Sequence, residues 1–352
     1  MKPLCYQIAE LFSGAGGMAL GAKSAKNEKA GFDLAWANDM DEDACKTFYR
    51  NLPIKPDRVI CSKVQHLDFA QMGRIDGLAF GFPCNDFSVV GKRKGIKGEY
   101  GKLYQWGEKA LRYFRPLFFV AENVGGLVSS GNNGDFDWIL CKFKQAGYEV
   151  HPSLYRFEQY GVPQNRHRLI IVGFRKDLSV AFEHPAPTHL KTPVTAMDAL
   201  ADIAEDSCNH EYTRHQSRVI ERLQHIKPGE NAFTATLPAR LKWRMNSGAT
   251  ITQMYRRLRP DQPAYTVTGS GGGGTHLYHW EEPRALTNRE RARLQTFPDH
   301  FCFSGSRGSV RKQIGMAVPP LGAEIIFRAV LKSLVENEIR PEACRTSLYN
   351  SH

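Results

Sequence analysis

The sequence predicts an α/β fold in which a parallel sheet carries helices on both of its faces. Up to about residue 182, short apolar runs alternate with segments of helical periodicity, as in a series of βαβ units. A glycine-rich turn follows the first apolar run, which is typical of a ligand-binding sheet of this kind. After residue 183 the chain becomes rich in Thr, Arg, Gly and Pro. We therefore expect a first domain over residues 1–182 and a smaller, loop-rich domain over residues 183–310.

The elements of the first domain follow from its apolar runs and from the periodic segments between them. Helices are expected over residues 41–51 and 104–114. The strands are expected at residues 7–11, 34–37, 77–80, 118–120, 149–151 and 169–172.

Helical periodicity returns near the carboxyl end of the chain. Thr287 and Glu290 have the spacing of a capping box, so a helix is expected over residues 287–295. A last helix is expected over residues 321–336, within a segment of about 311–338 that completes the first domain. The polar residues 339–352 are expected to form a disordered tail.

Composition narrows the class of protein. The 352 residues carry a net charge of +11, which predicts a polyanionic partner such as a nucleic acid. No two of the eight cysteines form a C-x-x-C pair, so no metal site is indicated, and scattered cysteines suggest a reducing compartment. No apolar run follows Lys2, and the run at residues 117–121 is too short to cross a bilayer. We expect a soluble, cytoplasmic protein that does not contact a membrane.

A cysteine and a carboxylate follow two of the expected strands. Cys84 lies on the turn after residues 77–80, and Glu122 follows the strand at residues 118–120. The carboxyl ends of such strands meet at the edge where ligands bind, and a nucleophile beside an acid suits a substrate that is attacked and protonated together. The alternatives are a buried thiol and a solvated acid. Polar residues after Cys84 and apolar neighbours of Glu122 favour the catalytic interpretation.

The loop at residues 12–21 has the glycines that a backbone needs to approach a ligand at the start of a helix. A dinucleotide fingerprint would need glycine in place of Ala19, and Glu10 would repel a pyrophosphate. A cofactor with a cationic or zwitterionic end fits better, and a simple tight turn is the alternative. Asp39, after the second strand, is expected to bind a ribose or to cap the helix that begins near Asp41.

Three long polar side chains precede the strand at residues 169–172. Gln164, Arg166 and Arg168 alternate, so they are expected on one side of an extended segment. Arginine beside a buried strand is costly unless it is paired. It is therefore expected to pair with Glu122 or to donate to a carbonyl oxygen of a substrate, whereas His167 points the other way and is expected to be structural.

Taken in order, these motifs resemble those of the DNA (cytosine-5) methyltransferase family of the bacterial restriction–modification type. The resemblance covers the chain from about residue 7 to residue 335. One such motif would be a weak signal, but six in the family's order are highly specific. The matching segments are 12–17, 83–84, 122–124, 164–168, the basic segment 284–299 and the segment 315–320.

The resemblance implies a Rossmann-like S-adenosylmethionine-dependent methyltransferase sheet with a smaller, loop-rich target-recognition domain. It implies methyl transfer from S-adenosyl-L-methionine to carbon 5 of a cytosine that is flipped out of double-stranded DNA. Cys84 would add to carbon 6, Glu122 would protonate N3, Arg168 would hold O2, and Arg166 would support the loop. The residues implied in cofactor binding are Phe12, Gly14, Ala15, Gly16, Gly17, Asp39, Met40, Pro83, Leu103, Met316 and Val318.

Two basic segments are expected to contact the DNA. Residues 90–102 carry five cations and one acid, and their glycines suggest a segment that closes over DNA, with a solvated flexible loop as the alternative. Residues 238–260 carry six cations and no acid, and the glycine-rich run 266–275 follows. The expected DNA-binding residues are Ser88, Lys92, Arg93, Lys94, Arg240, Arg244, Arg256, Arg257, Thr266, Gly272 and Gly273.

The family also implies partners. We expect double-stranded DNA as substrate, a cognate restriction endonuclease that is functionally paired but not necessarily bound, and a monomeric enzyme that protects host DNA.

The sequence departs from the family at three positions. Met316 stands where the family usually has asparagine, and Asn85 replaces a more usual glutamine. The family's aspartate for the adenine amino group is missing from residues 60–64, where Ser62 or another group would take its place. Three other functions are alternatives. An RNA cytosine methyltransferase is disfavoured by the basic segment before residue 284, and a nucleotide-dependent oxidoreductase is disfavoured by Ala19. The third alternative is a catalytically silent DNA-binding protein.

Overall fold

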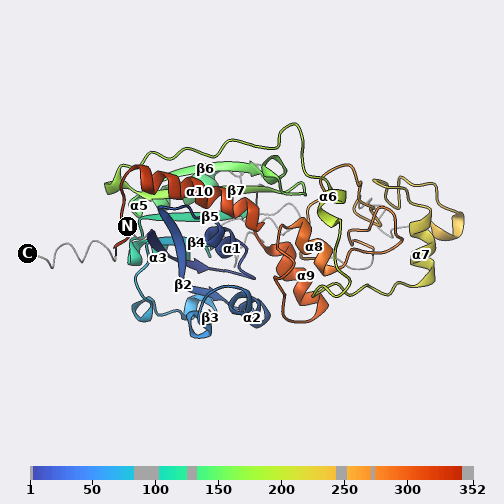
Figure 1. Ribbon diagram of the computed structural model, residues 1–352, viewed down its shortest axis with the longest axis horizontal. Helices are drawn as coiled ribbons and strands as arrows, with labels where there is room; N and C mark the ends of the chain where they lie inside the picture. The colour runs from blue at the N-terminus through green and yellow to red at the C-terminus, as the bar shows by residue number, and fades with distance from the viewer. Residues whose placement is uncertain (1–2, 83–102, 125–132, 243–251, 271–273, 343–352) are drawn as a thin grey trace, which may run out of the picture. The chain divides into compact units, whose positions relative to one another are not determined.

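The computed structural model describes residues 3–82, 103–124, 133–242, 252–270 and 274–342 (Figure 1). The chain divides into two compact units. Unit 1 comprises residues 1–156, 167–186 and 318–352, and unit 2 comprises residues 157–166 and 187–317.

A seven-stranded sheet forms the centre of unit 1, with the order β3-β2-β1-β4-β5-β7-β6. Its strands are β1 Leu4–Leu11, β2 Ala30–Asp39, β3 Val59–Cys61, β4 Gly77–Gly81, β5 Phe118–Val124, β6 Tyr148–Arg156 and β7 His167–Arg175. Strands β1 to β5 pair in parallel, but β7 is antiparallel to both β5 and β6. The expectation of a fully parallel sheet is therefore wrong at this edge. A parallel pair needs a long crossover, usually a helix, and no α-helix lies between β6 and β7.

Helices cover both faces of this sheet (Figure 1). They are α1 Gly17–Ser24, α2 Glu42–Asn51, α3 Tyr104–Phe114, α5 Asn133–Gln145 and α10 Pro320–Glu336. Phe119 of β5 packs with Phe143 of α5, whereas its neighbour Phe118 packs with Phe32 of β2, which in turn contacts Phe327 of α10. Successive side chains of a strand point to opposite faces, so α5 and α10 lie on opposite sides of the sheet.

Helix α10 packs closely against α1. A Cβ atom at Gly21 would lie 2.5 Å from the Ala323 side chain and 2.5 Å from the Pro320 carbonyl oxygen, so only glycine fits there. Residues 307–336 contain a stretch that is long and apolar enough to cross a membrane by length and composition alone. They form two helices that break at residues 317–319, and α10 buries Val330 and its neighbours in the core of unit 1. A core helix accounts for this apolar segment.

Unit 2 consists of short helices joined by irregular segments. Its helices are α6 Ala196–Leu200, α7 Ser217–Gln224, α8 Asn288–Leu294 and α9 Arg307–Met316. A small apolar core includes Leu223, Ile226, Tyr255 and Tyr278. The capping box at Thr287 and Glu290 is present, as the spacing predicted.

The two units are divided at residues other than the expected boundaries. Residues 157–166 and 311–317 group with unit 2, because the buried side chains of Gln164 and Arg166 bond to carbonyl groups of that unit. The disordered tail was expected to begin at residue 339, but Ile339 is buried and its carbonyl oxygen accepts a hydrogen bond from Tyr6 Oη at 2.5 Å.

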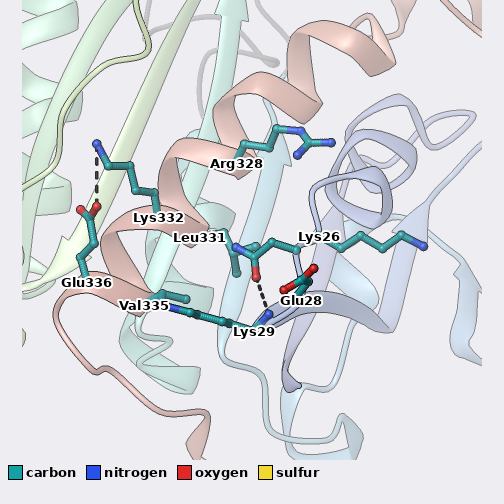
Figure 2. Close-up of a pocket in the computed structure, with 9 residues that line it drawn as sticks. Lys26, Glu28, Lys29, Arg328, Leu331, Lys332, Val335 and Glu336 are labelled. Carbon is teal, nitrogen blue, oxygen red and sulfur yellow. Dashed lines mark hydrogen bonds and ion pairs between the residues drawn. The ribbon is translucent and has the colours of Figure 1, made fainter. Parts of the chain in front are cut away.

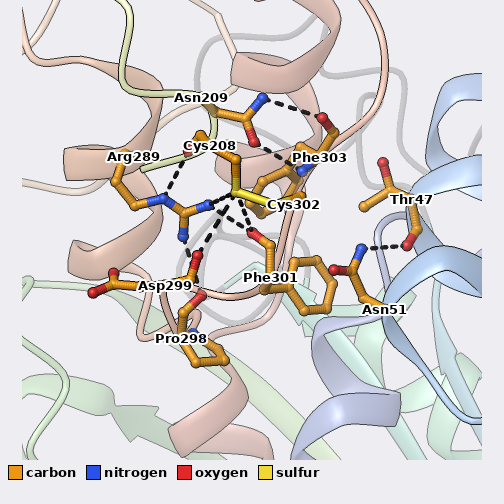
Figure 3. Close-up of a disulfide and its surroundings, with 10 residues drawn as sticks. All are labelled: Thr47, Asn51, Cys208, Asn209, Arg289, Pro298, Asp299, Phe301, Cys302 and Phe303. Carbon is orange, nitrogen blue, oxygen red and sulfur yellow. Dashed lines mark hydrogen bonds between the residues drawn. A yellow bond between two sulfur atoms is a disulfide. The ribbon is translucent and has the colours of Figure 1, made fainter. Parts of the chain in front are cut away.

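A disulfide joins Cys208 to Cys302 within unit 2 (Figure 3). Their Cα atoms are 5.7 Å apart although 94 positions separate them along the chain. Beside it, the fully buried guanidinium of Arg289 donates to the carbonyl oxygens of Cys208, Pro298 and Phe301 at 3.0, 3.1 and 2.6 Å. The scattered cysteines, which suggested a reducing compartment, did not predict this pair, because spacing along the chain does not reveal contacts between distant segments.

Candidate active site

A carboxylate and a guanidinium meet at one edge of the sheet. Arg168 Nε donates to Glu122 Oε1 at 2.8 Å, and both side chains are largely buried, with exposures of 14% and 13%. Glu122 stands beside Gly81 in the β4–β5 ladder, and a Cβ atom at Gly81 would lie 3.3 Å from Glu122 Oε2. The pairing of Arg168 with Glu122, one of the two expected alternatives, is present. The pair therefore lies next to the end of β4, the strand that leads toward Cys84.

Asn123 holds the end of β4 in place. Its side chain is 1% exposed, and Nδ2 donates to the Phe82 carbonyl oxygen at 3.1 Å. This contact fixes the backbone just before Pro83 relative to β5. We did not single out Asn123 from the sequence, because an amide after a carboxylate carries no signal of its own.

Several expected site residues lie outside the described part of the chain. They comprise the nucleophile, a cofactor residue and the first group of DNA contacts, and their roles remain predictions. These residues are Cys84, Pro83, Ser88, Lys92, Arg93 and Lys94.

The loop after β1 has the backbone that its glycines predict. Phe12, Gly14 and Gly16 adopt positive φ angles of 55°, 52° and 92°. A Cβ atom at Gly16 would lie 2.6 Å from Leu52 Cδ1 and 2.9 Å from Phe48 Cδ2, so this position requires glycine on both grounds. Ala15 and Gly17 are buried beside it. The loop leads directly into α1, as in a ligand-binding turn.

Three segments converge on Asn38 and Asp39 at the end of β2. Asp39 Oδ2 accepts from Gly14 N at 2.8 Å, and its carbonyl oxygen accepts from Ser62 N at 2.9 Å. Asn38 is 1% exposed, and its Nδ2 donates to the carbonyl oxygens of Ile60 and Ser62, both at 2.8 Å. The glycine loop, β3 and the segment after β3 are thus tied to one dipeptide.

Asp39 is not the cap of α2. The N-cap is Asp41, whose side chain accepts from Ala44 N, whereas Asp39 Oδ1 accepts from Asp41 N at 2.9 Å. Burial raises the pKa of Asp39, and hydrogen bonds from the backbone oppose this rise. The capping alternative is excluded, and the ribose-binding role stays a prediction.

Two buried polar atoms near the glycine loop have no hydrogen-bond partner, Glu10 Oε2 and Ser13 Oγ. Glu10 is 2% exposed, and burial raises its pKa well above the usual range, against the lowering effect of the Ala19 backbone amide. A buried carboxyl oxygen without a partner at this place fits the cationic amino-acid part of S-adenosyl-L-methionine better than an anionic cofactor. Of the other expected cofactor residues, Met40 is 67% exposed. Leu103 is the N-cap residue of α3.

Arg166 lies in a buried polar network of unit 2. Its guanidinium donates to the carbonyl oxygens of Val267, Gly315 and Ala317 at 2.9, 3.0 and 2.8 Å, and its exposure is 1%. These contacts join the segment of the glycine-rich run to the end of α9. Arg166 therefore positions backbone segments. It lies just before β7, which begins at His167 and carries Arg168.

The expected DNA contacts of unit 2 have different surroundings. Arg257 is buried at 5% exposure and donates to the carbonyl oxygens of His279, Leu223 and Ile226, so its assignment as a DNA contact is wrong. Arg256 stacks on Tyr265, with its Cζ atom 3.3 Å from the ring centroid.

The other contacts expected from unit 2 are divided between the described residues and the rest. Arg240 is exposed and pairs with Glu221, and the Thr266 hydroxyl donates to the Asn165 carbonyl oxygen at 2.5 Å. Arg244, Gly272 and Gly273 lie outside the described residues. Of the remaining expected cofactor residues, Met316 is 64% exposed and Val318 is 7% exposed.

A separate hollow of about 490 Å³ lies on unit 1, between α10 and the turn before β2 (Figure 2). Leu331 and Val335 line it together with Lys26, Lys29 and Arg328. None of the expected site residues belongs to this hollow.

The fold and the site first define a class of protein. A seven-stranded sheet with an antiparallel β7, a glycine loop after β1 and an acidic end of β2 make a Rossmann-like S-adenosylmethionine-dependent methyltransferase fold. A protein encoded within an E. coli prophage and described as a DNA modification methyltransferase has the same fold. The TM-score is 0.74 at 24% identity, over 94% of this chain and 99% of that chain.

A family model for C-5 cytosine-specific DNA methylases matches residues 6–332. Type II methyltransferase M.BbvI of Brevibacillus brevis is 56% identical over 347 residues, 95% of this chain and 92% of the relative. Type II methyltransferase M.NgoFVII of Neisseria gonorrhoeae is 38% identical over 343 residues, 94% of this chain and 88% of the relative. The chain belongs to the C-5 cytosine-specific DNA methylase family and is a DNA (cytosine-5-)-methyltransferase of the restriction–modification type, which confirms the resemblance seen in its sequence.

Proposed function

We propose that the enzyme methylates carbon 5 of one cytosine in a short sequence of double-stranded DNA, through transient addition of Cys84 to the base. The main support is the Glu122–Arg168 pair at the end of β5, beside the end of the strand that leads to Cys84. The largely buried carboxyl group provides an acid, and the guanidinium provides a fixed donor, at the edge where a ligand of this fold binds.

The reaction must make carbon 5 of cytosine nucleophilic. The Cys84 thiolate adds to carbon 6 while Glu122 gives a proton to N3, and the ring becomes an enamine. After carbon 5 has gained the methyl group, a base removes the proton of carbon 5 and the thiolate leaves from carbon 6, which restores the double bond. N3 returns its proton to Glu122 in the same elimination. Arg168 keeps Glu122 in position and donates to O2 of the base.

The cofactor in this proposal is S-adenosyl-L-methionine, which supplies the methyl group when bound. Asp39 would accept hydrogen bonds from its ribose, and the backbone of the loop at residues 12–17 would surround its amino-acid part. The buried Oε2 atom of Glu10, which has no hydrogen-bond partner, supports a cationic ligand, because a nearby positive charge would stabilise the carboxylate. The adenine contact near Ser62 would come from the segment that Asn38 holds.

DNA binding in this proposal involves both basic segments and a flipped cytosine. The flip costs a few kcal/mol and gives Cys84 access to carbon 6, which is hidden in a duplex. Arg240, Arg256 and Thr266 are the described candidates for contacts to phosphates and bases. We propose further that the enzyme is a cytoplasmic monomer that protects host DNA from a cognate restriction endonuclease.

Methyl transfer from labelled S-adenosyl-L-methionine to unmethylated DNA, followed by bisulfite sequencing, tests this function. We expect label at one cytosine of a short motif, loss of label in Cys84→Ala, and wild-type activity in Cys141→Ala, where the cysteine is exposed and unpaired. Label in RNA but not in DNA would contradict the assignment of the substrate. Activity that survives Cys84→Ala would contradict the covalent step.

A further inference from the structure

Two arginines of unit 2 differ from the other arginines of their helices. Arg291 of α8 is 2% exposed, yet its side chain forms no hydrogen bond or ion pair with any described residue. Arg311 of α9 has a buried Nε atom without a hydrogen-bond partner. By contrast, Arg289 donates to three carbonyl oxygens, and Arg293 pairs with Asp299 at 2.6 Å.

Apart from Glu290, the groups that act on Arg291 are positively charged or neutral. Helices α8 and α9 pack against each other, so Arg311 is a cationic neighbour, and burial followed by Arg311 lowers the pKa of Arg291 to about 10. Burial, together with both arginines, lowers the pKa of His276 to about 4, so this histidine is neutral at pH 7. His215 is a further neighbour of His276 and is itself held neutral, because burial lowers its pKa.

The nearest acid is already engaged. Both oxygens of Glu290 accept hydrogen bonds from Arg284, at 2.8 and 2.9 Å, and the backbone amide of Thr287 donates to it as part of the capping box. Glu290 therefore balances Arg284. In the described chain, no second carboxylate balances Arg291 and Arg311.

A buried guanidinium without hydrogen bonds is costly, and a second cation beside it adds repulsion. Apolar or amide side chains would fill the same space at a lower cost in free energy. An anion bound between the two arginines would offset this free-energy cost, because a guanidinium binds the oxygens of a phosphate with two parallel hydrogen bonds.

We propose that Arg291 and Arg311 form an oxyanion site for a phosphate oxygen, which the backbone of the bound duplex supplies. The source follows from the place of the site. His276 and Tyr278, which both interact electrostatically with Arg291, come shortly after the glycine-rich run of residues 266–275, where DNA contacts are proposed. A phosphate held here would fix the position of that segment on the duplex. This inference rests on the proposed DNA binding of unit 2.

Salt dependence of DNA binding tests the site. A labelled duplex that carries the methylated motif is titrated with enzyme at several KCl concentrations, for wild type, Arg291→Gln, Arg311→Gln and the control Arg328→Gln. Each phosphate contact contributes about 0.9 to the slope of log K against log salt. We expect both site variants to lose about one unit of slope, and the control, an exposed arginine of α10, to keep the wild-type slope.

Thermal unfolding without DNA provides a second measurement. Inorganic phosphate, compared with chloride at equal ionic strength, is expected to raise the melting temperature of wild type and not that of Arg291→Gln. In chloride, Arg291→Gln is expected to melt above wild type, since it removes a buried, unpaired charge. If Arg291→Gln does not fold, Arg311→Gln provides the same test at a half-buried position, because it should also lose the phosphate effect on the melting temperature.

The outcomes separate the proposals. A phosphate effect that both variants lose, with an unchanged salt slope, would overturn DNA as the source and assign the site to free phosphate. Unchanged slopes and no phosphate effect would overturn the site itself. Failure of wild type to bind duplex DNA, with a phosphate effect that depends on Arg291, would overturn the proposed function of unit 2 and leave an anion site.

Discussion

At the residue scale, the acid–guanidinium pair gives the sharpest test of the proposed chemistry. We expect Glu122→Gln to lower the rate of methyl transfer about 10²–10⁴-fold, because glutamine cannot give a proton to N3. The fold should persist, since the amide oxygen can still accept from Arg168. Single-turnover assays with saturating S-adenosyl-L-methionine measure this rate.

Glu149→Gln is the matched control, because Glu149 is an exposed residue of β6. It should leave the rate unchanged. A wild-type rate in Glu122→Gln would show that another group protonates the base.

Glu10 gives a prediction about pH. Its pKa is raised well above 4.5 by burial, so above about pH 4.5 the unfolded chain releases a proton that the folded chain keeps. Stability should therefore fall as pH rises toward the folded pKa. Glu10→Gln removes this titration, so the variant should be more stable than wild type at pH 8 and less dependent on pH, as measured by urea unfolding from pH 5 to pH 8.

The exposed Glu28 gives the control for this measurement, since Glu28→Gln should keep the wild-type profile. Parallel profiles for wild type and Glu10→Gln would contradict the assignment of a protonated carboxyl group.

The residues also show what a sequence can reveal about a site. Glu122 and Arg168 were predictable, because each sits beside an apolar run that sets its depth and its end of the sheet. The buried role of Arg257 was not predictable, since it lies in a segment rich in arginine. Charge alone does not distinguish a guanidinium that binds DNA from one that holds carbonyl groups. The buried roles of Asn38 and Asn123 depend on contacts between strands, which spacing does not contain.

At the scale of elements, the loop between β1 and α1 gives a test of the proposed cofactor site. We expect Gly16→Ala to lower the affinity for S-adenosyl-L-homocysteine and to destabilise the protein by roughly 1–3 kcal/mol, because the new Cβ would clash with Leu52 and Phe48 at a positive φ angle. Calorimetric titration and urea unfolding measure the two effects.

Gly73→Ala is the control for this loop variant, since nothing lies within 4 Å of the added atom. Equal effects of the two substitutions would contradict a special role for the loop.

Apolar runs located six of the seven strands, and the helices α2, α3, α8 and α10 begin and end within a residue or two of the expected positions. β3 was missed as a strand because it has three residues, of which only Val59 is buried. The direction of β7 was also wrong. A buried strand reads as an apolar run whether its neighbour is parallel or antiparallel, so only the length of the β6–β7 connection carried that information.

At the scale of the whole molecule, the disulfide of unit 2 predicts a dependence on redox state. Reduction, or Cys302→Ser, is expected to lower the free energy of unfolding by about 2–5 kcal/mol, since the bond closes a long loop of the unfolded chain. Urea unfolding with and without dithiothreitol measures this difference.

Cys141→Ser, at an exposed and unpaired cysteine, should unfold as wild type does under both conditions. An identical midpoint for wild type with and without reductant would contradict a stabilising bond.

The division into units could not be predicted from composition alone. The change of composition after residue 183 marks the start of unit 2 within a few residues. Residues 157–166 belong to the same unit because of a few buried hydrogen bonds from Gln164 and Arg166, which have no counterpart in local composition.

The close fit of α10 on α1 has a consequence for synthesis. The chain leaves the ribosome from its amino end, and domains fold as their residues emerge. Helix α1 and the sheet are complete by residue 175, but the helix that covers Gly21 begins only at Pro320. Unit 2 is therefore made in full while unit 1 still has an uncovered apolar face. The nascent enzyme must keep that face from aggregation until its last helix has been made.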